Sequence, residues 1–181
     1  MSYIEQEKAF DRAVVFLSSA ASTQATLPVA SILHSIRVGL SLQQQGYSKE
    51  VILAGFLHDV VEDTHATVEE VEAQFGVRVA ELVRALTFDM ELEPQRRSQD
   101  SVDRCKLLGK EALAIKAADL LDNLHFYLAD ANPSRFGQLA ESLKYFLDAS
   151  VEELGQENDW VEVDHQRKEL LARMAKENLA R

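Results

Sequence analysis

Apolar residues recur at three- and four-residue spacing along most of the chain, which is the pattern of helices that bury one face. The first such stretch covers residues 3 to about 20. Gly46 is placed to end a second helix, and Ser48 is placed to cap a third. Strand-like alternation bounded by turn residues is hard to find, and only 7 Gly and 3 Pro occur in 181 residues. We therefore predict an all-α protein.

The same spacing predicts where the other helices lie. We expect them over about 28–45, 49–62, 67–75, 77–86, 101–108, 111–129, 132–154 and from about 158 to the end of the sequence. The helix over 49–62 is apolar on nearly all sides, which predicts a central position. Residues 18–26 read as a loop. Residues 87–100, which include Pro94, are expected to form a mobile loop or lid.

The composition limits the classes of function. Hydrophobic residues make up 46% of the chain, which predicts a folded globule. The formal net charge of -11 argues against a general DNA or RNA binder and against binding to an anionic membrane. The lone Cys105 excludes a disulfide framework and a cysteine zinc cluster. We see no signal peptide or membrane-spanning run and expect a cytoplasmic protein.

The organisation of the chain is that of one domain. No internal repeat or low-complexity tract is found, so we expect a single domain over residues 1–181. Its core is expected at about 28–128, followed by C-terminal helices at about 132–181. The sequence leaves open whether the last helix packs on this domain or on a second subunit. It also leaves open whether the chain forms a homo-oligomer.

One stretch, residues 54–64, joins an apolar run to a group of polar residues. His58 and Glu62 are four residues apart and share a face if the stretch is helical, as do Asp59 and Asp63. Buried charges are costly unless they are paired or bind a metal. The apolar neighbours favour burial, so we interpret the group as a metal or proton-transfer site. An exposed acidic helix end is the alternative.

Two further residues have the same setting on other predicted helices. His34 and Asp119 are each flanked by apolar residues, and helices pack through their apolar faces. Taken alone, His34 reads as a hydrogen-bonded core histidine and Asp119 as a solvated residue. Together with His58 and Asp59 they form a set of imidazoles and carboxylates that suits a divalent metal with open water positions. Such a metal lowers the pKa of water.

The motifs resemble one superfamily closely. His34, the His58–Asp59 pair and Asp119 are similar to the metal signature of HD phosphohydrolases. The runs HDVVEDT, at 58–64, and KAADLLDN, at 116–123, resemble the hydrolase domain of the RelA/SpoT family and its small stand-alone SpoT-like relatives, over about residues 28–128. The resemblance implies an all-α HD-domain helical bundle. It also implies Mn²⁺-dependent removal of the 3′-pyrophosphate from the nucleotide (p)ppGpp.

The resemblance also implies roles for residues. It implies metal ligation by His34, His58, Asp59 and Asp119. It implies that Glu62 and Asp63 orient or deprotonate the attacking water, and that Asn123 contacts the substrate. The family's basic, glycine-containing loop before the first histidine is absent, because residues 22–33 contain no Arg, Lys or Gly. Other cations must then hold a phosphate. The candidates, each of which taken alone reads as a surface charge, are Arg37, one turn from His34, and Arg96, Arg97, Arg104, Lys106 and Lys116.

Three hypotheses follow from the sequence. The leading one is a metal-dependent phosphohydrolase acting on a nucleotide, with (p)ppGpp as the best single substrate and another nucleotide or phosphate ester as the alternative. The second is a module that senses a nucleotide without turnover, which the missing basic loop suggests. The third is a structural helical protein whose acidic C-terminal helix mediates assembly.

Overall fold

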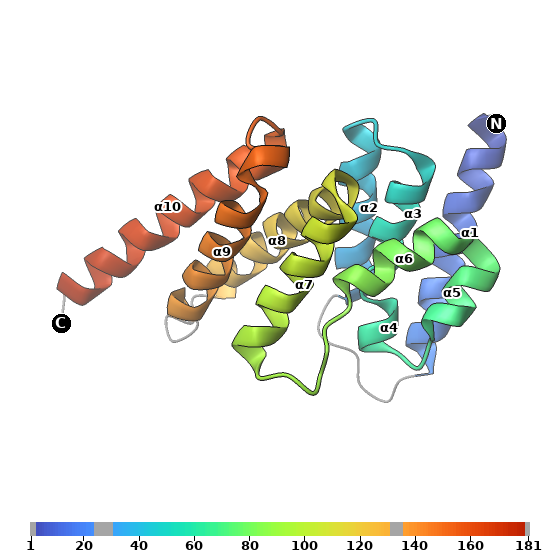
Figure 1. Cartoon of the computed structure of the whole chain (residues 1–181), viewed down its shortest axis with the longest axis horizontal. Helices are drawn as coiled ribbons and strands as arrows, with labels where there is room; N and C mark the ends of the chain where they lie inside the picture. Colours follow the sequence, from blue (N-terminus) through green and yellow to red (C-terminus); the bar gives the residue numbers. More distant parts are fainter. Residues whose placement is uncertain (1–2, 24–30, 131–135, 180–181) are drawn as a thin grey trace. The chain divides into compact units, whose positions relative to one another are not determined.

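A computed structural model describes residues 3–23, 31–130 and 136–179, in which every regular element is a helix. The all-α prediction is therefore confirmed for the part of the chain that is described (Figure 1). The helices are α1 (Tyr3–Ser22), α2 (Ser31–Gln44), α3 (Lys49–Leu57), α4 (Val60–Asp63), α5 (Val68–Phe75), α6 (Val77–Leu86), α7 (Pro94–Leu108), α8 (Lys110–Asp130), α9 (Phe136–Leu154) and α10 (Asn158–Leu179).

Backbone contacts divide the chain into two compact units. The first unit is Met1–Phe88, which holds α1 to α6, and the second is Asp89–Arg181, which holds α7 to α10. That the two form one domain stays a prediction. Each unit has its own apolar core, so each can be described by itself.

Helix α3 is the centre of the first unit, where it packs against α1, α2 and α6. All of its residues from Val51 to Leu57 are buried, which confirms the prediction from its apolar surroundings. The rings of Phe10 on α1 and Phe56 on α3 meet edge to face at 5.6 Å. A helix buried on all sides holds its C-terminal end rigidly, and that end carries His58.

Helices α2 and α3 approach each other closely because Gly55 has no side chain. A Cβ atom placed there would lie 2.5 Å from the Leu42 Cδ1 atom and 3.2 Å from the Gly39 Cα atom. The first distance is well inside van der Waals contact. The close approach sets how far His34 on α2 lies from the end of α3.

Local signals fix several helix ends as predicted. The Ser48 hydroxyl accepts from the Val51 N–H at the start of α3. Thr67 and Glu70 form a capping box at the start of α5. Gly76 has a φ of 94°, and this left-handed backbone separates α5 from α6. The starts predicted at Pro28 and at Asn132–Pro133 lie outside the described residues.

Two predicted loops are shorter than expected. Helix α1 runs on to Ser22, so the first part of the loop predicted at 18–26 was wrong; Ala21 is buried there and extends the apolar face of α1. Helix α7 begins at Pro94, so the second half of the loop predicted at 87–100 is helical. Proline suits the first turn of a helix, since its missing N–H would have no partner there.

In the second unit, α8 packs against α7, α9 and α10. Its residues from Ala112 to Asp119 are all buried, including the polar pair Lys116 and Asp119. Between α10 and α9, the Trp160 indole N–H donates to the Ser150 hydroxyl. This unit therefore has a tightly packed core with a few polar side chains inside it.

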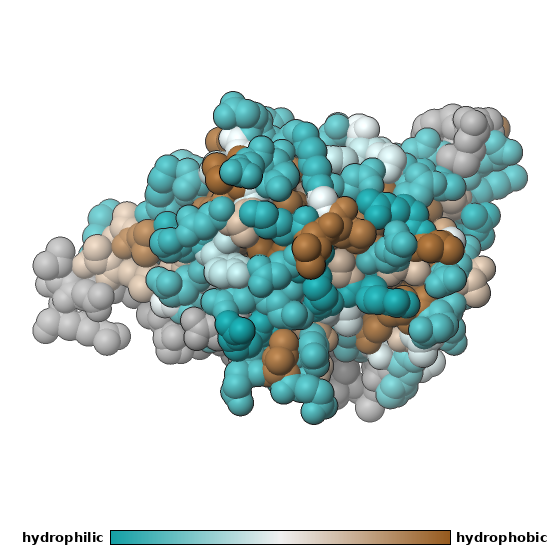
Figure 2. Space-filling view, viewed as in Figure 1, coloured by the Kyte–Doolittle hydropathy of each residue, from teal (hydrophilic) through white to brown (hydrophobic). Residues whose placement is uncertain are grey.

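The surface is mainly hydrophilic on the face shown in Figure 2, where hydrophobic side chains occupy small separate patches. Among the described residues, none of the helices combines the length and the apolar character that crossing a bilayer requires.

Candidate metal centre

The chain turns at His58 and Asp59 instead of continuing as the single helix that we predicted over 49–62. Helix α3 ends at Leu57 and α4 begins at Val60. The backbone of Asp59 has φ and ψ of -96° and -4°, away from the values of a regular α-helix. The Asp59 side chain makes no capping hydrogen bond to α4. The turn thus leaves its carboxylate available to neighbours outside the helix.

His34 and His58 meet where α2 packs on α3. Their Nε2 atoms are 3.1 Å apart, and both side chains are buried. The Nδ1 atom of His58 lies 2.9 Å from the Gly55 carbonyl oxygen, which can only accept, so Nδ1 carries the proton. The Nε2 atom of His58 then keeps a lone pair that faces His34. A second-sphere hydrogen bond of this kind is what orients histidine ligands in metal sites.

Asp59 completes a group of three residues that can each offer one ligand atom to a metal ion. Its Oδ1 atom lies 3.2 Å from His58 Nε2, and its Oδ2 atom lies 3.5 Å from His34 Nε2. One ligand atom from each of the three residues falls within 4.8 Å of the others. Two imidazole nitrogens and a carboxylate fit a divalent cation that accepts nitrogen and oxygen ligands. These three predicted ligands are thus brought together within the first unit.

The predicted catalytic residues follow in α4. Burial, and after it the Asp59 carboxylate, raise the pKa of Asp63 from 3.8 to about 6, while His58 and His34 oppose the rise. A carboxylate with a pKa in this range is suited to accept a proton near neutral pH. Glu62 is exposed, and its Oε2 atom accepts the backbone N–H of Phe88 at 3.0 Å. Glu62 therefore also holds the chain that leaves α6.

The other predicted ligand, Asp119, belongs to the second unit. Its Oδ2 atom lies 2.8 Å from the Lys116 ammonium nitrogen, and its Oδ1 atom accepts from the Asn123 amide at 2.6 Å. Lys116, Asp119 and Asn123 all belong to the second motif, and their spacing brings them onto one side of α8. Lys116 and Asp119 are both buried.

The predicted phosphate-binding cations differ in their surroundings. Arg37 is exposed on α2, one turn beyond His34. Arg97 donates to the backbone carbonyls of Met90 and Leu92 and so holds the segment before α7. Arg104, also on α7, is paired with Asp100 at 2.8 Å. Arg97 and Arg104 have structural contacts that their sequence setting did not reveal.

Sequence reasoning missed two contacts that shape the centre. The first is the approach of α2 and α3 through Gly39 and Gly55. Glycine inside a predicted helix was the available signal, because it costs helix stability and so suggests close packing. The second is the hydrogen bond from the Phe88 N–H to Glu62, which no local sequence pattern predicts because the two residues are far apart in the sequence.

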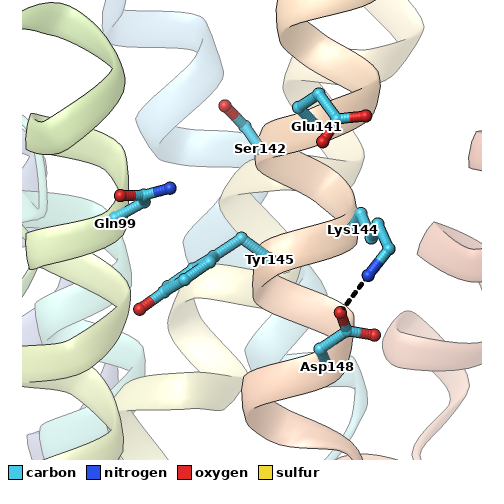
Figure 3. Close-up of a pocket in the computed structure, with 6 residues that line it drawn as sticks. All are labelled: Gln99, Glu141, Ser142, Lys144, Tyr145 and Asp148. Atoms are coloured by element: carbon cyan, nitrogen blue, oxygen red, sulfur yellow. Dashed lines mark hydrogen bonds and ion pairs between the residues drawn. The ribbon is translucent and has the colours of Figure 1, made fainter.

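A cavity of about 110 Å³ lies between α7 and α9 in the second unit (Figure 3). It is lined by Gln99, Glu141, Ser142, Lys144, Tyr145 and Asp148. Lys144 is ion-paired with Asp148, and the Tyr145 hydroxyl donates to Asp103. None of the predicted site residues lines the cavity, and its volume is below the roughly 300 Å³ of small ligand pockets. We assign it no role.

Comparison with known proteins places the chain in one family. Residues 13–146 match the HD domain family. Over 93 residues the chain is 43% identical to the guanosine-3′,5′-bis(diphosphate) 3′-pyrophosphohydrolase MESH1 of Drosophila melanogaster, covering 50% of this chain and 52% of that protein. The enzyme of the same name from Danio rerio is 40% identical over 95 residues, which cover 51% and 53% of the two chains. The chain thus spans about half the length of these curated relatives.

A solved structure gives the same picture at the level of the fold. It is a metazoan orthologue of SpoT that hydrolyses ppGpp and plays a role in starvation responses. The TM-score is 0.76 and the sequence identity 28%, with 89% of this chain and 94% of that one covered. The expected HD-domain fold and the expected resemblance to SpoT-like hydrolases are confirmed.

Proposed function

Since the chain belongs to the HD domain family, we propose that it is a metal-dependent phosphohydrolase that acts on a nucleotide. The observation that carries the proposal is the convergence of His34, His58 and Asp59 at one point. Our best candidate for the substrate is guanosine-3′,5′-bis(diphosphate), the compound in the names of the Drosophila and Danio relatives.

The proposed metal ligands are His34, His58, Asp59 and Asp119, and the proposed ion is Mn²⁺. The hydrogen bond from His58 to the Gly55 carbonyl supports this set, because it presents an unprotonated nitrogen to the ion. The second motif supports Asp119, whose carboxylate is buried in an otherwise apolar stretch of α8. Mixed nitrogen and oxygen ligands without thiolates suit Mn²⁺ better than a structural zinc ion.

When bound, such a cation polarises phosphoryl oxygens and makes water a better nucleophile. The residues of the chain supply the rest. Asp63 and Glu62 orient the attacking water and accept its proton. The water oxygen forms a bond to the phosphorus that is attached to the ribose 3′ oxygen, and the bond from that phosphorus to the 3′ oxygen breaks. The 3′ oxygen takes up a proton to become a hydroxyl, and pyrophosphate is released with the water oxygen. Asn123 and Arg37 contact the ribose or the phosphates, where the planar guanidinium of Arg37 suits a phosphate group.

A different substrate is the main alternative. Residues 22–33 carry no cation to hold a nucleotide, unlike the corresponding loop that the SpoT-like family uses. This difference favours another nucleotide or phosphate ester, or a module that binds a nucleotide without turnover. The net charge of -11 supports a small-molecule substrate over DNA or RNA, and we propose a cytoplasmic location.

The experiment is a hydrolysis assay on the purified chain. Guanosine-3′,5′-bis(diphosphate), GDP, GTP and deoxynucleotides are each incubated with Mn²⁺ or with EDTA, and released phosphate and pyrophosphate are measured. We expect Mn²⁺-dependent release of pyrophosphate from the first compound. Asp59→Ala should abolish it, whereas Asp11→Ala, an exposed change on α1, should not. Tight nucleotide binding by the wild type without any product would support the sensing module and contradict the enzyme.

A further inference from the structure

Lys116 is an unusual lysine because its charged end is inside the protein. The residue is 4% exposed, in a run of α8 whose residues from Ala112 to Asp119 are all buried. Burying an ammonium group is costly unless an anion compensates for the lost water. Asp119, one turn further along α8, is that anion: the Lys116 nitrogen lies 2.8 Å from its Oδ2 atom.

Asn123 holds the other oxygen of the same carboxylate. Its side-chain amide donates to the Oδ1 atom of Asp119 at 2.6 Å. With Lys116 on one oxygen and Asn123 on the other, the plane of the Asp119 carboxylate is fixed from both sides. A carboxylate oxygen carries two lone pairs, so an oxygen that accepts one hydrogen bond can also bind a metal ion.

The neighbouring helix does not supply a competing anion at Cys105. This residue of α7 is fully buried, and burial raises the pKa of its thiol to about 11 although Lys116 and Arg104 oppose the rise. A neutral thiol leaves the charge of Lys116 directed at Asp119. The Lys116 side chain is also unsuited to reach a substrate in solution, because the residue is buried.

We propose that Lys116 is a positioning residue for the metal centre: together with Asn123 it fixes the Asp119 carboxylate in the orientation in which that group binds the ion. The inference deepens the proposed function and rests on it, since it takes Asp119 as a ligand. It replaces the substrate contact that the sequence motif suggested for Lys116. Partners of this kind usually contribute about 10- to 100-fold to metal affinity or activity.

The test is a titration of the full chain with Mn²⁺, followed by isothermal calorimetry, alongside kcat and KM for the substrate found in the hydrolysis assay. Lys116→Met keeps the length of the side chain and removes its charge. Lys110→Met is the matched control on the same helix, because Lys110 is exposed and pairs with Glu157. We expect Lys116→Met to raise the Kd for Mn²⁺ at least about tenfold and to lower kcat. We expect KM to change little and Lys110→Met to match the wild type.

Two results would overturn the inference. An unchanged Kd for Mn²⁺ with a raised KM would mean that Lys116 contacts the substrate. Tighter Mn²⁺ binding by Lys116→Met would mean that the ammonium competes with the ion. If circular dichroism shows that Lys116→Met is unfolded, Lys116→Arg carries the test, because it keeps the charge and changes the geometry. It should weaken Mn²⁺ binding, and an unchanged Kd would contradict the inference.

The outcome for Lys116 can be separated from the outcome for the proposed function. A wild-type chain that binds Mn²⁺ but hydrolyses no nucleotide would refute the enzyme, while the effect of Lys116→Met on the Kd for Mn²⁺ would still decide the role of Lys116. A wild-type chain that binds no Mn²⁺ would overturn both.

Discussion

Gly39 of α2 faces the ring of Phe56 on α3 so closely that a Cβ atom at position 39 would lie 2.3 Å from the Phe56 Cδ1 atom. Both residues are fully buried. The contact joins α2, which carries His34, to α3, which ends at Leu57, directly before His58. The spacing of the His34 and His58 imidazoles therefore depends on residue 39 having no side chain.

Gly39→Ala should accordingly disturb both the stability and the metal centre. The added methyl group must push α2 and α3 apart, which costs about 1–3 kcal/mol of unfolding free energy for an overpacked core. Urea unfolding in EDTA measures the first effect, and Mn²⁺ titration should show weaker binding. Gly137→Ala is the control, because a Cβ there meets nothing within 4 Å. Equal stability and Mn²⁺ affinity for Gly39→Ala and the wild type would refute the proposed role of the contact.

The raised pKa of Asp63 makes the stability of the metal-free chain depend on pH. The pKa is about 6 in the folded chain and 3.8 as the reference value, so the folded state binds more protons between these pH values. The free energy of unfolding therefore falls as the pH rises through this window. Asp63→Asn removes the titrating carboxyl group, so the unfolding free energy of the variant does not fall for this reason in this pH window. In EDTA we expect the variant to gain about 1 kcal/mol on the wild type between about pH 3.5 and about pH 7.5, allowing for solvent screening. A difference that does not vary with pH would contradict the assignment.

Glu62 can be tested for its two roles separately. Glu62→Gln keeps an oxygen that accepts the Phe88 N–H but removes the ability to take a proton. We expect kcat to fall by about 100-fold while hydrogen exchange at the Phe88 amide stays as in the wild type. Glu62→Ala should lose both the activity and the protection of the Phe88 amide from hydrogen exchange. If Glu62→Gln keeps full activity and only Glu62→Ala loses it, the residue serves to hold Phe88 and not to move a proton.

Cys105 should not react with thiol reagents in the folded chain. It is buried, and the pKa of its thiol is about 11, so the reactive thiolate is scarce at neutral pH. A thiol reagent at about pH 8 should label the protein only after denaturant is added. Rapid labelling of the native chain would show that the packing between α7 and α8 differs from the structure described.

Helix ends set by neighbours in the sequence could be predicted, and those set by distant residues could not. The capping box of Thr67 and Glu70 is local, so the start of α5 follows from the sequence alone. The turn at His58 and Asp59 is not local, because the helical spacing of apolar residues continues through it to Val60 and Val61, and His58 meets His34 on another helix.

The same distinction applies to individual side chains. Lys116 and Asp119 have the three-residue spacing of an ion pair, but sequence spacing does not reveal that the pair is buried. Their burial follows from the packing of α8 against three other helices. The start of α7 at Pro94 had a usable local signal, and we gave more weight to the polar residues after it than to the proline.

The most direct test of the central claim is anomalous scattering from crystals of the wild-type chain grown with Mn²⁺. We predict one strong manganese peak in contact with the Nε2 atoms of His34 and His58 and with a carboxylate oxygen of Asp59, and we propose Asp119 as a further ligand. A manganese peak elsewhere, or none at these histidines in a chain that hydrolyses the nucleotide, would contradict it.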